Sequence, residues 1–153
     1  MEMKEQPWYA NYPSYVNKEL DTAQYSSLVE LIDESLSKFS NLPGYTNMGK
    51  TLTFGEIDQL SRNFAAYLQS VGMKKGDRIA IQMPNVLQYP VVLFGALRAG
   101  LTVVNTNPLY TTREMEHQFN DSGAEALVVL ANFADKVQKV LPNTQIKYVF
   151  VTE

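Results

Sequence analysis

The sequence predicts a doubly wound α/β fold, in which helices cover both faces of a mainly parallel sheet. Short apolar segments typical of buried strands alternate along the chain with segments of helical period. Consecutive parallel strands need crossover connections, which are right-handed and place helices against the sheet. We expect an extended aromatic arm, residues 1–26, to precede the α/β unit, residues 27–153.

Composition limits the class of protein. With 153 residues, the chain has the length of one domain and buries about 70% of the surface that its unfolded form exposes. Hydrophobic residues make up 45% and charged residues 19%, which indicates a globular protein. The net charge of -3 gives no basic surface for nucleic acid. The absence of cysteine excludes disulfides and thiolate metal sites, and suits a reducing compartment.

The first segment is rich in aromatic residues and turn formers, including Trp8, Tyr9, Tyr12 and Tyr15. This composition predicts an extended arm rather than a helix. We expect the arm to pack against its own body. An anchor at a membrane interface and an arm exchanged between subunits stay open, although the scarcity of basic residues disfavours the anchor.

The α/β unit should begin with a helix from Ser27, which the turn at Asn41 ends. A hairpin turn is expected at residues 47–50. Thr53 and Glu56 form a capping-box pattern, so a second helix should start there and end near Gly72.

The remaining elements alternate in type. The apolar run at residues 78–83 predicts a buried strand, which Pro84 ends. Further helices are expected at residues 88–99, 112–122 and 133–141, and further strands at residues 102–105, 126–130 and 148–151.

Residues 44–51, GYTNMGKT, match the phosphate-loop pattern G-x-x-x-x-G-K-[ST]. A phosphate loop joins a buried strand directly to a helix, whose N-terminus binds the phosphates. Here a helix end and a turn come before the pattern, and the capping box places the next helix start two residues too late. The context therefore favours a hairpin over a phosphate site.

His117 is the only histidine and follows Glu114 by three residues on a predicted helix, so both would lie on one helix face. A metal site would need further ligands that the sequence does not supply in a second such pair. No nucleophile is evident for His117 to activate as a base. We therefore expect a solvated or capping histidine, and no metal ligands in this chain.

Asparagines follow three of the predicted strands. In open parallel sheets, ligands bind beyond the carboxyl ends of the strands, which makes these positions candidates for substrate contact. Asparagine is also favoured in turns and helix caps, and the capping role suits Asn132 best. The candidate substrate-binding residues are Asn85, Asn105 and Asn107.

Two segments carry a resemblance to a known family. Residues 52–57 read LTFGEI, and residues 97–114 read LRAGLTVVNTNPLYTTRE, continuing as MEHQFNDSGA over residues 115–124. Together they resemble the two N-terminal motifs of the AMP-forming acyl-CoA synthetase and adenylation superfamily. The longer motif is similar to that of bacterial long-chain fatty acid CoA ligases, and the likeness runs from about Trp8 to the end of the chain.

The resemblance implies a parent enzyme that uses ATP, Mg²⁺ and CoA to convert a fatty acid into acyl-CoA, AMP and pyrophosphate. In this family, the Ser/Thr/Gly-rich phosphate loop with its lysine lies C-terminal to the matched regions. We therefore expect the chain to be the N-terminal scaffold of a longer enzyme, without catalytic residues of its own and inactive when isolated.

A cytoplasmic location is expected, with peripheral association at the inner face of the membrane left open. Self-association through the arm or through exposed apolar surface is also left open. The alternative to the enzyme scaffold is a self-contained α/β binding or dimerisation module. The strand end at residues 79–85 lacks the acidic residue of a receiver-like domain, and no flavodoxin-like phosphate loop follows a strand.

Overall fold

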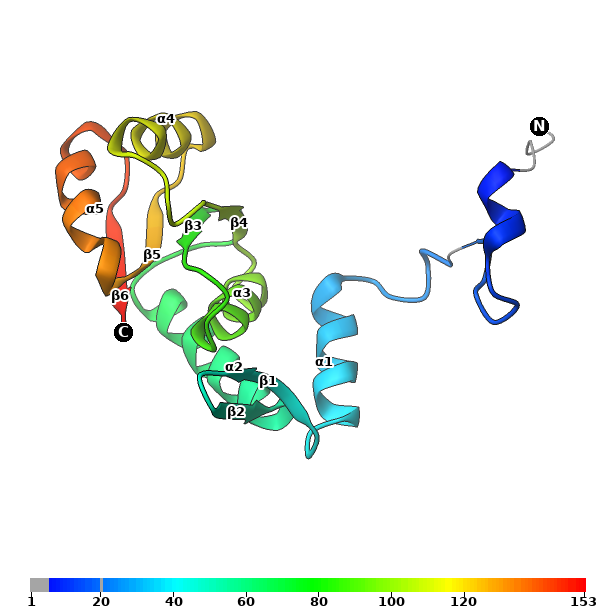
Figure 1. Ribbon diagram of the computed structural model, residues 1–153. Coiled ribbons are helices and arrows are strands. Elements are labelled where there is room, and N and C mark those ends of the chain that lie inside the picture. Colours follow the sequence, from blue (N-terminus) through cyan, green and yellow to red (C-terminus); the bar gives the residue numbers. More distant parts are fainter. Residues whose placement is uncertain (1–5, 20) are drawn as a thin grey trace.

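A computed structural model of the chain describes residues 6–19 and 21–153. Its centre is a parallel four-stranded sheet with the order β4-β3-β5-β6 (Figure 1). The strands are β3 (Arg78–Gln82), β4 (Thr102–Asn105), β5 (Ala126–Leu130) and β6 (Tyr148–Thr152). The expected parallel α/β sheet is thus confirmed.

Helices cover both faces of this sheet. Helices α2 (Phe54–Ser70) and α3 (Gln88–Arg98) pack on one face, where they meet Ile79 and Ile81. Helices α4 (Thr112–Ser122) and α5 (Ala134–Val140) pack on the other face, which Ala80 joins. Successive strand residues point to opposite faces, so one apolar strand supplies both cores. The doubly wound prediction is confirmed.

Helices α2 and α3 approach each other closely at Gly95. A Cβ atom at this position would lie 2.8 Å from Phe64 Cδ1 and 2.9 Å from the Ser61 carbonyl oxygen. Because backbone cannot give way as a flexible side chain does, only glycine fits here without a shift of the helices.

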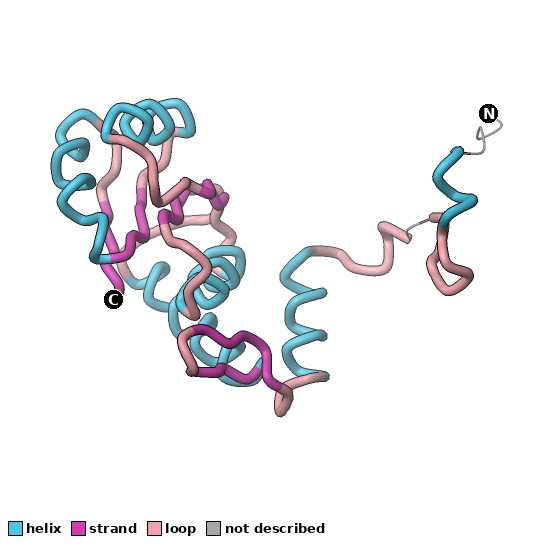
Figure 2. Tube along the Cα trace, in the orientation of Figure 1, coloured by secondary structure: helices cyan, strands magenta, loops and turns pink. Residues whose placement is uncertain are grey.

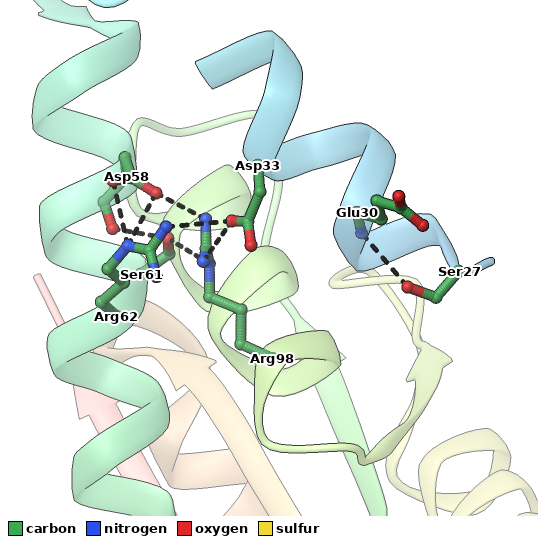
Figure 3. A network of polar contacts seen from close by, with 7 residues as sticks. All are labelled: Ser27, Glu30, Asp33, Asp58, Ser61, Arg62 and Arg98. Atoms are coloured by element: carbon green, nitrogen blue, oxygen red, sulfur yellow. Dashed lines mark hydrogen bonds and ion pairs between the residues drawn. The ribbon is translucent and has the colours of Figure 1, made fainter. Parts of the chain in front are cut away.

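A network of ion pairs holds helix α1 (Leu28–Lys38) to the helices beneath it (Figure 3). The Arg98 side chain is only 7% exposed, and its Nη1 and Nη2 lie 2.6 Å from Asp33 of α1 and Asp58 of α2, respectively. Arg98 Nε also donates to Ser61 Oγ at 3.1 Å. The exposed Arg62 contacts the same two carboxylates. Every nitrogen of the buried guanidinium therefore has a partner, as burial of a charge requires.

Side chains cap the starts of α2 and α4, and the sequence predicted the first of these two caps. Thr53 and Glu56 form a capping box at α2, and Thr111 and Glu114 form another at α4. Gly123 ends α4 in the left-handed region, at φ +64°.

The predicted helix at residues 133–141 is shorter than expected. Its α-helical part is α5 alone, between two 3₁₀ turns, η2 (Ala131–Phe133) and η3 (Leu141–Asn143). Pro142 lacks the N–H that would continue the helical hydrogen bonds, which accounts for the early end.

The hairpin is confirmed. Strands β1 (Pro43–Asn47) and β2 (Lys50–Thr53) pair antiparallel around Met48 and Gly49. Both turn residues have positive φ, 48° and 80°, as two-residue hairpin turns of the favoured hand require.

The N-terminal arm differs from the prediction in two ways. Its residues Pro7–Asn11 form a 3₁₀ helix, η1, because the fixed φ of proline suits the first turn. The ring–ring contacts of Trp8, Tyr9 and Tyr12 stay within the arm, where the Tyr9 ring packs edge-on against the other two. Near its end the arm contacts the body, where Ser26 donates hydrogen bonds to Glu30 of α1. Tyr15 is 85% exposed, and the segment leads away from the sheet through a loop (Figure 2). The expected packing of the aromatic residues 8–15 against the body is therefore wrong. Residues 1–5 of the predicted arm lie outside the described residues.

Within residues 6–19 and 21–153, every helix is too short or too polar to cross a bilayer.

Candidate functional site

The carboxyl ends of the four parallel strands define the edge where a ligand would bind. The connection after β3 runs through α3 on one face, and the connection after β5 runs through α5 on the other. Strands β3 and β5 are neighbours, so the chain leaves this edge in opposite directions between them. Such a switch point is the usual ligand crevice of an open α/β sheet.

An open groove of about 960 Å³ adjoins this edge. The hairpin, α2, the start of α3 and the ends of β5 and β6 form its walls. Its lining is mainly apolar, and it includes half-buried and exposed side chains that the central core leaves uncovered. Among these lining residues are Leu60, Phe64, Tyr67, Leu130, Phe150 and Val151. The polar residues that line it are Asn47, Lys50, Gln88, Asn132, Thr152 and Glu153.

Asn85 lies in the exposed loop after β3, as predicted. Its carbonyl oxygen accepts a hydrogen bond of 3.2 Å from Asn47 Nδ2, which ties the hairpin to the switch-point loop. The next residues, Val86 and Leu87, line the groove. Asn85 thus borders the groove through its backbone.

Asn105 ends β4 and is exposed. Its Oδ1 accepts a hydrogen bond of 2.7 Å from the Tyr89 hydroxyl of α3, and its carbonyl oxygen accepts one of 3.1 Å from Gln118 Nε2 of α4. The residue therefore connects helices from the two faces of the sheet.

Asn107 has a local role in its loop. Its Oδ1 accepts a hydrogen bond of 2.9 Å from the Leu109 N–H, the geometry of an Asx turn. Its carbonyl oxygen accepts another from the Tyr110 N–H at 3.2 Å. The turn interpretation that we weighed against ligand contact therefore describes the interactions of this side chain.

The capping role expected for Asn132 is wrong. Phe133 is the N-cap of α5 and makes no capping hydrogen bond with its side chain, whereas Asn132 lies within η2 and lines the groove. A 3₁₀ turn inserted between β5 and α5 shifts the cap by one residue.

The three predicted residues do not form one cluster around the groove. Asn85 borders it, but Asn105 ends β4 and Asn107 follows it, and β4 is the edge strand on the far side of β3. Sequence analysis missed the apolar walls of the groove. The signal for them was the presence of Leu60 and Tyr67, apolar residues outside the main buried stripe of α2.

The phosphate-loop pattern forms the hairpin, as expected. Gly44 lies in β1 and Lys50 begins β2, and Leu52 and Thr53 separate the pattern from α2. The pattern therefore lacks the helix N-terminus that would bind phosphates.

His117 is exposed on α4 and lines a shallow cavity of about 540 Å³ together with Arg113 and Lys139. The Glu114 carboxylate instead accepts hydrogen bonds from the backbone N–H and hydroxyl of Thr111, which lower its pKa. Glu114 is thus a capping residue. Among the described residues, no three His, Asp or Glu side chains are grouped to hold a metal ion.

Comparison with known proteins relates the chain to enzymes. Residues 32–152 match the family described as AMP-binding enzyme. The long-chain-fatty-acid-CoA ligase of Escherichia coli O157:H7 is 51% identical over 146 residues, which cover 95% of this chain and 26% of the relative. The ligase of the same name from Bacillus subtilis is 33% identical over 97% of this chain and 26% of the relative.

A solved structure shares the fold. The long-chain-fatty-acid-CoA ligase from Archaeoglobus fulgidus superposes with a TM-score of 0.73 and 29% identity, over 82% of this chain and 27% of that one. The chain thus spans about a quarter of the length of the relatives that it matches.

Proposed function

Because this chain belongs to the AMP-binding enzyme family, we propose that it forms the N-terminal part of a long-chain fatty acid CoA ligase. The complete enzyme would convert ATP, a fatty acid and CoA into acyl-CoA, AMP and pyrophosphate. The observation that carries this proposal is the high identity with ligases of that name across almost the whole chain.

In this proposal, the chain is a scaffold rather than the catalytic centre. Its phosphate-loop pattern is a hairpin. The proposal assigns the magnesium ligands and the loop that binds the ATP phosphates to other parts of the enzyme. What this chain supplies is a rigid sheet edge and the apolar groove beside it.

We also propose that Asn85, Asn105 and Asn107 contact substrate in the complete enzyme. All three are exposed at the carboxyl edge of the sheet. In Asn105 and Asn107 the amide oxygen already accepts a hydrogen bond within the chain, so the Nδ2 group is the end that would reach a ligand. Asn105 is the stronger candidate, because the Tyr89 hydroxyl fixes its orientation.

The proposed organisation is an arm, residues 1–26, followed by the scaffold, residues 27–153. The exposed aromatic rings of the arm support a role in contacts outside this chain, with a second copy or with a membrane interface. The proposed location of the enzyme is the cytoplasm, with peripheral attachment at the inner face of the membrane.

A chimera tests the assignment. The matching N-terminal quarter of the Escherichia coli ligase would be replaced by this chain, and acyl-CoA formation from palmitate, ATP and CoA would be measured. We expect activity within about tenfold of the unaltered ligase, because the core contacts of the scaffold would be retained. A chimera that folds, as judged by circular dichroism, but forms no acyl-CoA would contradict the proposal.

The isolated chain provides the second arm of the test. With ATP, magnesium and palmitate, it should release pyrophosphate only at the background rate. Turnover by the isolated chain would overturn the scaffold role. The alternative is a self-contained binding module. It would be favoured if the isolated chain bound another molecule tightly but the chimera that contains it formed no acyl-CoA.

A further inference from the structure

Two polar side chains are buried beside each other at the carboxyl edge, under helix α4. Gln82 is 0% exposed and Thr106 is 4% exposed. Gln82 Oε1 and Thr106 Oγ1 are enclosed and have no hydrogen-bond partner among the described residues. Buried polar groups in native proteins nearly always have a partner, so these two require an explanation.

The strand register places both side chains in the same layer. Strands β3 and β4 pair in parallel up to Ile81 and Asn105, and Thr106 N–H donates to the Ile81 carbonyl oxygen at 3.0 Å. The next pair along this register is Gln82 and Thr106. Each lies two residues after a side chain that packs on the α4 face, Ala80 and Val104, respectively. Both therefore point toward α4 from neighbouring strands.

Helix α4 brings the half-buried Gln118 to this layer. Gln118 lies between Met115 and Phe119, whose side chains are fully buried against the sheet. Its Nε2 donates to the carbonyl oxygen of Asn105, the residue before Thr106. Its Oε1 is enclosed and has no partner among the described residues.

The orientation of the Gln82 amide is fixed by its other end. Gln82 Nε2 donates to the Asn107 carbonyl oxygen at 3.3 Å. Reversing the amide would set two oxygens against each other and would still leave one end without a partner. The same holds for Gln118 and the Asn105 carbonyl.

We propose that one internal water molecule bridges the side chains of Gln82, Thr106 and Gln118. The hydrogen-bonding capacity matches: the water donates to the two amide oxygens and accepts from the threonine hydroxyl. Internal waters typically make about three hydrogen bonds to groups that are otherwise unsatisfied. The bridged atoms are neutral oxygens, so a water satisfies them without the burial of a charge.

This water site holds the β4–α4 loop in place. The two Gln amides bind the carbonyl oxygens on either side of Thr106, and the water joins the three side chains behind them. The loop that carries Asn105 and Asn107 is thereby fixed to the end of β3 and to α4. The inference concerns this chain alone and does not depend on the proposed enzymatic function.

The change Thr106→Val tests the bridge, because it replaces the hydroxyl with a methyl group of nearly equal size. If the water is present, the change removes one of its partners, and the folding equilibrium constant should fall roughly five- to thirtyfold. If the hydroxyl has no partner at all, valine removes a desolvated polar group and stability should rise or stay unchanged. A rise, or an unchanged stability, would overturn the proposal.

A matched variant calibrates this measurement. The Thr144 hydroxyl has a partner in the structure, the Leu141 carbonyl oxygen at 3.0 Å. Thr144→Val should therefore lower stability in the same chemical denaturation assay, and Thr106→Val should behave like it.

A double-mutant cycle tests whether the two side chains share one water. The double variant Thr106→Val/Gln82→Met should lose less stability than the sum of the losses of its single changes, because both act on one water. Strict additivity would contradict a shared bridge.

Nuclear magnetic resonance of the unaltered chain gives a readout that does not depend on the variants folding. We expect cross-relaxation between a long-lived water and the side-chain amide protons of Gln82 and Gln118. These signals should be lost in Thr106→Val if that variant folds. Their absence from the unaltered protein would overturn the proposal.

Discussion

The two faces of the sheet satisfy their buried polar groups in different ways. On the α2–α3 face, the buried Arg98 has a protein partner for each of its side-chain nitrogens, because a further helix, α1, brings Asp33 to it. On the α4–α5 face, Gln82 and Thr106 lie under a single helix and keep oxygens without protein partners. An added helix can supply a charged partner to a buried group. Where no such helix is present, the internal water that we propose would supply the missing partner.

The largest effect that tests this comparison is expected at Arg98. Arg98→Met should lower the free energy of unfolding by about 3 kcal/mol, because it removes the buried cation between Asp33 and Asp58 and leaves these carboxylates only the exposed Arg62. Thermal or chemical denaturation measures this loss.

The control for this prediction is Arg62→Met. Arg62 contacts the same two carboxylates, but its side chain is 52% exposed, so the loss should stay below about 1 kcal/mol. Equal losses from both variants would show that burial does not set the strength of this network.

The next effect concerns the packing of the α2–α3 face. Gly95→Ala would place a Cβ atom 2.9 Å from the Ser61 carbonyl oxygen and should cost about 1–3 kcal/mol of stability through overpacking. Gly55→Ala provides the control, since its Cβ would lie 3.1 Å from the Ser40 carbonyl oxygen and alanine gains helix propensity. An unchanged melting temperature for Gly95→Ala would mean that the two helices separate without cost.

A smaller, pH-dependent contribution to stability should be alike on the two faces, because a helix on each face begins with a capping box. Hydrogen bonds from the backbone N–H and hydroxyl of Thr53 lower the pKa of Glu56, and those from Thr111 lower the pKa of Glu114, from an ordinary value of 4.5. The folded pKa values lie below the unfolded ones. The stabilisation is therefore complete above about pH 4.5 and is lost as the pH falls through the lowered values.

Removal of the hydroxyls tests this pH dependence. Thr53→Ala and Thr111→Ala should each cost about 1 kcal/mol at neutral pH and should raise the pKa of the partner glutamate toward 4.5. Titration of the glutamate carboxyl groups by nuclear magnetic resonance measures both pKa values. A shift at only one of the two helices would show that the faces differ in their caps as well as in their cores.

The smallest effect is expected at the exposed pair of Lys147 and Glu125. Their side chains are 64% and 35% exposed, and their atoms Nζ and Oε2 lie 2.5 Å apart. Lys147→Gln should move the melting temperature by less than about 2 °C, and added salt should reduce the difference further. A change as large as that of Arg98→Met would contradict the link between burial and the strength of these pairs.

The sequence predicts elements well where a local signal specifies both start and end. Helix α2 is such a case, because Thr53 and Glu56 cap its start and Gly72, with φ +95°, follows its end. The prediction was weaker at α5, whose flanking 3₁₀ turns carry no strong cap. It was wrong for the packing of the arm, because aromatic composition does not specify the surface against which a segment lies.

For the candidate site, the sequence predicted the edge but not its organisation. The rule for parallel sheets placed Asn85, Asn105 and Asn107 at the carboxyl ends of strands, where the structure has them. That Asn107 bonds its own loop, and that Asn105 binds Tyr89, depends on distances that spacing in the sequence does not give.

The sequence by itself determined the alternation of strands and helices, the capped start of α2 and the resemblance to the AMP-binding family. Each depends on residues close together in the chain, where periodicity and hydrogen bonds to the nearby backbone decide the outcome. Only the tertiary structure decided the strand order, the ion pairs of Arg98 with Asp33 and Asp58, and the polar cluster of Gln82, Thr106 and Gln118. These features join residues that are distant in sequence, and whether a buried polar group has a partner depends on what the fold brings within hydrogen-bond distance.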